Sequence, residues 1–127
     1  MIVRTIEDLK NSGRYAEKPG SWTSARYLLK GDGMGFTVTR TSVSAGSVME
    51  MEYKNHLEAN LIVSGKGRLH DLATGDVHEL SPGSMYALDK HDRHRVEALS
   101  DMSIVCVFTP ALTGSETHDE QGSYPLL

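Results

Sequence analysis

Short runs of strand-forming residues, separated by turn residues at close intervals, fill the middle of this chain and constrain its fold most strongly. We recognise eight runs by their enrichment in Val, Ile, Thr and aromatic residues or by alternation of apolar and polar residues. They are residues 36–43, 48–53, 59–63, 68–72, 77–80, 84–88, 94–98 and 102–108. Strands this short, with no helical segments between them, are typical of sandwiches and barrels rather than of a parallel sheet. We therefore predict an all-β jelly-roll barrel.

The two ends of the chain are expected to depart from this pattern. Thr5 is followed by Glu7 and Asp8, which predicts a short helix after an N-cap, ending near Asn11-Ser12-Gly13. Residues 14–35 are rich in Gly, Ser and Lys, so we expect a loop with a short edge strand there. Pro and Gly recur among polar residues in 109–127, which predicts an irregular tail that can close over the barrel mouth.

Composition limits the size of the fold and the classes of partner. With 127 residues and 39% hydrophobic content, we expect one domain over residues 1–127, with its core at about 36–108. The net charge of −4 and the absence of Lys and Arg clusters argue against a nucleic-acid partner. No apolar stretch resembles a membrane span or an export signal, and the lone Cys106 cannot form an intrachain disulfide. We expect no membrane partner and a cytoplasmic location.

The first candidate metal ligand comes from a motif of the cupin barrels, G-x5-H-x-H-x3-E-x6-G. Gly46, Glu58 and Gly65 match this motif in register, so the chain resembles the cupin superfamily. Glu52 and Lys54 occupy the two positions where most cupins carry histidines. Two of the usual four ligands are therefore missing, whereas the glutamate remains.

The second cupin motif contains G-x-x-H, and here Gly83-x-x-Tyr86 puts a tyrosine in place of the histidine. A phenol oxygen can bind a cation that lowers its pKa, and His94 could restore a third ligand. Glu58, Tyr86 and His94 form a mixed oxygen and nitrogen set, which suits iron or zinc with open positions for a substrate. Each residue alone is more often a surface or turn residue. The match of two of them to motif positions favours a metal-dependent enzyme.

Longer segments resemble one cupin family, the ectoine synthases. These segments are Tyr53-Lys54-Asn55-His56-Leu57-Glu58-Ala59, the stretch from Pro82-Gly83 to His91-Asp92-x-His94, and Cys106-Val107-Phe108-x-Pro110. The likeness runs from Met1-Ile2-Val3-Arg4 to Gly122-Ser123-Tyr124. It implies a cytoplasmic homodimer that cyclises N-γ-acetyl-L-2,4-diaminobutyrate, with loss of water, to the compatible solute ectoine. It also implies ferrous iron as the cofactor, with zinc as the alternative, held by Glu58, Tyr86 and His94.

The resemblance further suggests residues that contact the substrate. Arg26 could bind its carboxylate with a bidentate fork, and Trp22 could provide an apolar wall or a face for the ammonium group. Thr41 matches a substrate position of similar proteins. Alternation in residues 104–108 puts Cys106 and Phe108 on one strand face, and their family positions favour the cavity wall. From the residues alone, a surface arginine and a core tryptophan are as ordinary as the functional roles. An unpaired cysteine among valines is normally a small core residue, so the core reading of Cys106 is the stronger one.

Ring closure needs a base for the ammonium group and an acid for the departing oxygen. Tyr53, Glu116 and His118 are the candidates, and the last two lie in a tail that resembles a lid of the family. An acidic, solvated run is the ordinary alternative for this tail. His56, His91 and Asp92 lie near the proposed ligands in sequence and could orient them.

Two other functions remain open at this point. A cupin isomerase or lyase could act on another small polar metabolite, because the barrel supports many reactions. A non-catalytic, ligand-binding cupin is the second alternative, although the chain has no recognition-helix pattern through which a regulator would act. The sequence does not decide between iron and zinc, or which group is acid and which is base.

Overall fold

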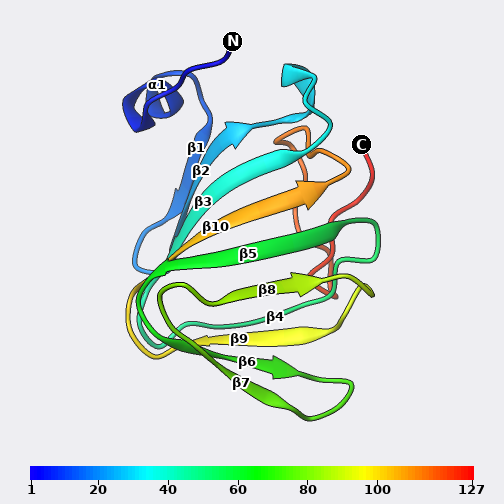
Figure 1. Ribbon diagram of the computed structural model, residues 1–127. Helices are drawn as coiled ribbons and strands as arrows, with labels where there is room; N and C mark the ends of the chain where they lie inside the picture. Colours follow the sequence, from blue (N-terminus) through cyan, green and yellow to red (C-terminus); the bar gives the residue numbers. More distant parts are fainter.

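The computed structural model describes all 127 residues as two antiparallel sheets that face each other, with a short helix near the N-terminus (Figure 1). The six-stranded sheet has the order β1-β2-β3-β10-β5-β8, and the four-stranded sheet has the order β4-β9-β6-β7. The strands are β1 Tyr15–Lys18, β2 Trp22–Leu28, β3 Thr37–Val43, β4 Val48–Met51, β5 Leu57–Ser64, β6 Gly67–Asp71, β7 Val77–Leu80, β8 Met85–Leu88, β9 His94–Ala98 and β10 Met102–Thr109. The predicted all-β fold is confirmed.

The eight predicted strands correspond to β3 through β10, with ends that differ by at most two residues. The predicted helix is α1, Ile6–Asn11, and Thr5 caps it. The Thr5 hydroxyl accepts from the Asp8 amide at 3.2 Å, and the Asp8 carboxylate accepts from the Thr5 amide at 2.8 Å. This reciprocal pair satisfies two backbone donors that the first helical turn leaves free. Neither α1 nor the 3-10 turn after β2 approaches the length or hydrophobicity needed to cross a bilayer.

The expectation for residues 14–35 was wrong in part, because two strands form there rather than one. β2 pairs with β3 along most of its length, and β1 covers the edge of β2. The polar residues of β2 hid the strand pattern. Trp22, Ser24 and Arg26 face a cavity where polar groups are accommodated, whereas Ala25 is buried on the other face. A 3-10 turn, Lys30–Asp32, follows β2.

The core lies between the two sheets and follows the alternation of the strands. Met102, Ile104, Cys106 and Phe108 of β10 are all buried and belong to one hydrophobic cluster of 14 residues. Burying a side chain of this size contributes roughly 1.5–3 kcal/mol. The inner face of the barrel is therefore apolar where the sheets pack, and polar side chains lie among apolar ones around the cavity described below.

Gly65 shows why the first cupin motif ends in glycine. Its φ is +87°, and an added Cβ would overlap the carbonyl oxygen of Asp101. Only glycine adopts this conformation at little cost in such a space. The motif match at this position is therefore explained by backbone geometry, because the turn from β5 to β6 must pass closely over the loop before β10.

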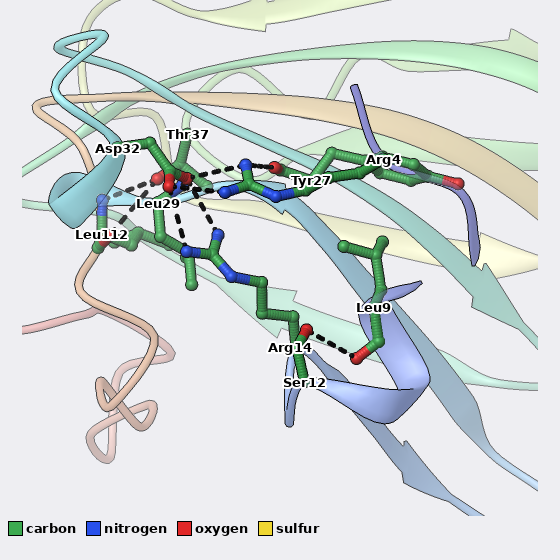
Figure 2. A network of polar contacts seen from close by, with 9 residues as sticks. All are labelled: Arg4, Leu9, Ser12, Arg14, Tyr27, Leu29, Asp32, Thr37 and Leu112. Carbon is green, nitrogen blue, oxygen red and sulfur yellow. Dashed lines mark hydrogen bonds and ion pairs between the residues drawn. The ribbon is translucent and has the colours of Figure 1, made fainter. Parts of the chain in front are cut away.

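Asp32, a half-buried residue whose side chain is 7% exposed, holds the N-terminal segment against the rest of the barrel (Figure 2). Arg14 donates to it at 2.8 and 3.0 Å, and Arg4 donates at 2.8 and 3.2 Å. The Leu29 amide adds a fifth hydrogen bond at 2.9 Å. These bonds, from Arg14 first and then Arg4, hold the pKa of Asp32 far below its usual range. We call Arg4, Arg14 and Asp32 the Asp32 cluster.

The same region holds the beginning of the C-terminal tail (Figure 2). The Lys30 amide donates to the Leu112 carbonyl at 2.7 Å. On the other side, the Leu112 amide donates to the Thr37 hydroxyl at 2.8 Å. Leu29 is buried and packs beside Gly114. The 3-10 turn Lys30–Asp32, which the Asp32 side chain stabilises, thus contacts the first residues of the C-terminal tail.

Candidate active site

The inner faces of the two sheets enclose a cavity of about 650 Å³, a volume suited to a small metabolite. Ten of the eleven predicted site residues line it: Trp22, Arg26, Thr41, Tyr53, Glu58, Tyr86, Cys106, Phe108, Glu116 and His118. The eleventh, His94, lines an adjoining cavity of about 490 Å³, which also includes Tyr86. The predicted residues therefore gather around two spaces that share one side chain.

Strand register aligns five of the lining side chains in a row across the six-stranded sheet. Arg26 pairs with Thr39, Thr39 with Cys106, Cys106 with Asn60, and Asn60 with Tyr86. Paired residues of adjacent strands point to the same face of a sheet. We call Arg26, Thr39, Cys106, Asn60 and Tyr86 the cavity row. It crosses the sheet from β2 to β8, with the guanidinium of Arg26 at one end and the phenol of Tyr86 at the other.

Glu58 lies on β5, two residues before Asn60 on the same face, and it is 7% exposed. It takes part in none of the ion pairs of the structure. Burial raises the pKa of Glu58 to about 8, and the neighbouring Asn60 amide opposes part of this rise. A carboxyl group buried without a cation is costly when ionised, and a bound metal ion would supply the missing charge.

His94 begins β9 and is 1% exposed. Its Nδ1 lies 3.0 Å from the Asp92 carbonyl oxygen, which can only accept, so the ring proton is assigned to Nδ1. The other nitrogen, Nε2, is buried and has no hydrogen-bond partner. Burial lowers the pKa of His94, so the ring is neutral near pH 7. The Nε2 lone pair is therefore available to a ligand, and the Asp92 backbone fixes its orientation.

Tyr86 stands beside both groups. Its ring centroid is 6.3 Å from that of His94, and burial, followed by the charge of Glu58, raises the pKa of Tyr86 well above its usual value. No group of three or more His, Cys, Asp or Glu side chains is arranged to hold a metal ion, so a metal centre built on Glu58 and His94 would need a further donor, such as the Tyr86 oxygen. A buried carboxyl, an unpartnered imidazole nitrogen and a phenol fit iron or zinc. These three groups offer two oxygen donors and one nitrogen donor, and the metal itself stays a prediction.

The tail after β10 contains no helix or strand, as predicted, and several of its side chains line the cavity. His118 Nε2 lies 2.9 Å from the hydroxyl oxygen of Tyr53, which is itself buried. Burial lowers the pKa of His118, whereas it raises that of Tyr53 well above its usual value. Near neutral pH the pair is a neutral imidazole and a neutral phenol. It can pass a proton in either direction.

Glu116 is engaged within the tail itself. Its carboxylate accepts hydrogen bonds from the Thr113 amide at 2.7 Å, the Thr113 hydroxyl at 2.8 Å and the Gly114 amide at 2.9 Å. Burial would raise the pKa of Glu116, but these bonds outweigh it, and the pKa is lowered. The carboxylate remains ionised and stabilises the turn that precedes His118.

The predicted substrate contacts have different surroundings. Arg26 donates to the Gly114 carbonyl at 3.0 Å, which leaves other donors of its guanidinium for a ligand. The Cys106 thiol lies 3.7 Å from the Thr41 hydroxyl, and burial raises the pKa of Cys106 to about 12. A thiol with this pKa is a wall group and not a nucleophile. Phe108 contacts the Tyr53 ring edge-on, with centroids 5.2 Å apart.

Asn60 and Tyr124 are among the lining residues that the sequence analysis did not identify. Asn60 is 2% exposed, and its position two residues after Glu58 on one strand could have revealed it. Tyr124 stacks on Tyr53 at 5.2 Å, but no periodic pattern locates a residue in an irregular tail. His56, suggested as an orienting group, is buried with both ring nitrogens unpartnered and does not line either cavity.

Comparison with known sequences gives one consistent result. The family described as ectoine synthase matches residues 1–127 of this chain. The L-ectoine synthase of Sphingopyxis alaskensis is 54% identical over 125 residues, covering 98% of this chain and 90% of that protein. The L-ectoine synthase of Hahella chejuensis is 48% identical over 126 residues, covering 99% and 95%.

Comparison with solved structures agrees. The ectoine synthase from P. lautus has a TM-score of 0.87 and 43% identity, covering all of this chain and 91% of that one. An RmlC-like cupin from Shewanella frigidimarina has a TM-score of 0.64 and 14% identity, covering 76% and 83%. The second likeness shows the fold alone and supports the cupin architecture.

Proposed function

Because the chain belongs to the ectoine synthase family of hydro-lyases, we propose that it cyclises N-γ-acetyl-L-2,4-diaminobutyrate to ectoine with the assistance of a bound metal ion. In this reaction the α-amine attacks the carbonyl carbon of the acetamide, and the carbonyl oxygen leaves as water. The observation that carries the proposal is the convergence of ten predicted side chains on one cavity of about 650 Å³.

Glu58, Tyr86 and His94 would hold the metal ion, which we propose to be ferrous iron, with zinc as the alternative. When bound there, it would act as a Lewis acid toward the acetamide oxygen. The unpartnered Nε2 of His94 and the raised pKa of Glu58 support this assignment, because both describe groups that lack a positive partner. Glu52, which stands where most cupins carry a histidine, is not one of these three proposed ligands, so its presence removes none of them.

The chain orients the substrate from the opposite end of the cavity row. A carboxylate bound by the free donors of Arg26 directs the acetamide group toward Glu58 and Tyr86, across the width of the sheet. Trp22, Cys106 and Phe108 surround the methylene chain with apolar surface, and Thr41 contributes a hydroxyl. The cavity holds the amine and the carbonyl in ring-closing geometry. This lowers the activation free energy, because the loss of rotational and translational entropy occurs when the substrate binds and not during the reaction.

Tyr53 and His118 would transfer the protons. The ammonium group must lose a proton before it can attack, and the neutral His118 ring can receive it through the Tyr53 hydroxyl. After the attack the same substrate nitrogen gives up a second proton, and the pair delivers both protons to the departing oxygen, which leaves as water. Glu116, ionised and bonded to Thr113 and Gly114, would position the tail that carries His118.

The tail would act as a lid within a single cupin domain that spans residues 1–127. Its far end is bonded to the segment between β4 and β5: the Lys54 amide donates to the Ser123 hydroxyl at 2.9 Å, and Asn55 donates to the Tyr124 carbonyl at 2.8 Å. These few polar contacts can break to admit substrate and form again to exclude water.

We further propose a homodimer located in the cytoplasm. Leu57, Leu61, Val63 and Met85 are 40–62% exposed and lie on the outer face of β5 and β8. An apolar sheet face of this kind is typical of surfaces that associate. The free, buried thiol of Cys106 is compatible with a reducing compartment.

The experiment is to incubate the iron-loaded protein with N-γ-acetyl-L-2,4-diaminobutyrate and to quantify ectoine by chromatography. We expect ectoine to accumulate with wild-type protein and not with Glu58→Ala. Absence of ectoine from folded, iron-loaded wild-type protein would overturn the proposal. Binding of the substrate without turnover would then favour a ligand-binding cupin, and neither binding nor turnover would favour another substrate.

A further inference from the structure

Asn60 is a buried amide that the reaction described above leaves unused. It lies near the middle of β5, is 2% exposed and lines the main cavity. Its Nδ2 has no hydrogen-bond partner. Leaving a buried donor without a hydrogen bond costs about 1–3 kcal/mol, so such a donor normally has an acceptor in the protein, in water or in a ligand. In a cavity wall, the missing acceptor is most simply an atom of a ligand.

The neighbours of Asn60 show which part of a ligand it would meet. Tyr86 on β8 and Cys106 on β10 flank it directly in the cavity row, and Glu58 precedes it by two residues on the same face. The Asn60 amide lies close enough to the Glu58 carboxyl to lower its pKa as a donor, although no hydrogen bond of normal geometry joins the two groups. Even with one N–H turned toward Glu58, the second N–H of Nδ2 stays free. Asn60 is therefore beside the proposed metal ligands and retains a free donor.

The chemistry of the substrate supplies the acceptor. Its acceptor atoms are the carboxylate oxygens and the acetamide oxygen, whereas the ammonium group can only donate. Arg26 lies three strands away from Asn60 in the same row, a distance of roughly 14 Å at about 4.8 Å per strand. With the carboxylate at Arg26, the acetamide oxygen is the acceptor that falls at the Asn60 end of the cavity.

We propose that the Asn60 side-chain amide donates a hydrogen bond to the acetamide oxygen of the substrate, an inference that rests on the proposed function. Negative charge grows on this oxygen as the amine attacks, so the bond strengthens toward the transition state. Asn60 thereby orients the acetamide and lowers the barrier to ring closure. It does so as an accessory donor, next to the groups that would hold the metal.

The test compares Asn60→Val with Asn60→Thr. The two side chains have the same shape and suit a strand, and they differ by one hydroxyl donor. We expect Asn60→Val to lower kcat/KM by about tenfold, the worth of one hydrogen bond, with unchanged metal content. Asn60→Thr should recover part of the loss. Asn11→Val, the same change at an exposed position of α1, is the matched control and should leave kcat/KM unchanged.

A second measurement separates loss of the hydrogen bond from a general disturbance of the cavity. L-2,4-diaminobutyrate lacks the acetamide oxygen, so its competitive inhibition constant should be the same in wild-type protein and in Asn60→Val. Unchanged kcat/KM, weaker inhibition by the diamine, or a parallel loss of metal through Glu58 would each overturn the inference. If Asn60→Val does not fold, Asn60→Leu, which keeps the branched shape of asparagine, gives the same comparison. Wild-type protein that makes no ectoine would overturn the proposed function and the inference together.

Discussion

Buried polar side chains without a partner identify the part of the molecule on which the proposed chemistry depends. Glu58 has no basic partner, His94 has a free Nε2, and Asn60 has a free amide nitrogen. Each would cost free energy in an otherwise apolar barrel. Glu58 and Asn60 line the main cavity and His94 lines the adjoining one, so a ligand with positive charge and hydrogen-bond acceptors would satisfy groups from both cavities.

The raised pKa of Glu58 makes the stability of the metal-free protein depend on pH. The carboxyl titrates near 4.5 when exposed and at about 8 when folded, so between these values the folded state binds the extra proton. The free energy of unfolding of chelator-treated protein should therefore fall as pH rises from about 5 to about 8 and then level off. Urea unfolding across this range measures it, and Glu58→Gln should remove this component of the slope. Identical slopes for the two proteins would contradict the pKa assignment.

The Tyr53–His118 contact predicts a specific loss of turnover. Tyr53→Phe keeps the ring that packs against Phe108 and removes the hydroxyl that contacts His118. We expect kcat to fall by about 100-fold, with a smaller change in KM, because proton transfer is lost while the cavity shape is kept. Steady-state kinetics provides the measurement, and Tyr15→Phe on the edge strand is the control. A Tyr53→Phe enzyme with wild-type kcat would exclude this proton relay.

Sequence reasoning located Glu58 and Tyr86 because each occupies a motif position with a backbone requirement nearby, such as the positive φ of Gly65. Sequence reasoning does not single out Asn60, because the residue lies within the apolar run 59–63, which predicts a core strand. The difference between a core asparagine and a cavity asparagine lies in the space in front of it. That space is formed by β2, β10 and the tail, which are distant in sequence.

Among the elements, strands β3 to β10 could be predicted because turn residues separate them and apolar residues recur along them. β2 could not, since Ser24 and Arg26 face the cavity and interrupt the pattern. The link from the 3-10 turn to the tail was also beyond sequence reasoning. It depends on Asp32 meeting two arginines that lie 18 and 28 residues earlier.

The Asp32 cluster predicts that an arginine far from the cavity stabilises the barrel. Arg14→Gln removes two hydrogen bonds, of 2.8 and 3.0 Å, to a buried carboxylate, and should lower the free energy of unfolding by about 2 kcal/mol. Arg68→Gln is the matched control, because its ion pair with Glu79 is exposed and contributes little. Chemical denaturation of both variants tests this. Equal stabilities would show that the cluster contributes no more than a surface pair.

At the scale of the whole molecule, the outer face of the six-stranded sheet predicts an association that a charge would disrupt. Leu61 on β5 is 45% exposed and lies between Val105 of β10 and Met85 of β8. Leu61→Lys should convert a dimer into a monomer of 13.9 kDa, because burying the ammonium group in an apolar interface is costly. Val48→Lys, at an exposed position of the other sheet, should not. Sedimentation of both variants gives the masses, and a Leu61→Lys dimer would place the interface elsewhere.

The most direct test of metal-assisted ring closure in this cavity is to titrate ferrous iron into chelator-treated protein and to follow both bound metal and ectoine formation. We predict that chelation abolishes ectoine formation and that activity returns in proportion to bound iron, reaching its maximum at one ion per chain. Chelator-treated protein that is free of metal and still converts N-γ-acetyl-L-2,4-diaminobutyrate at the full rate would contradict the account.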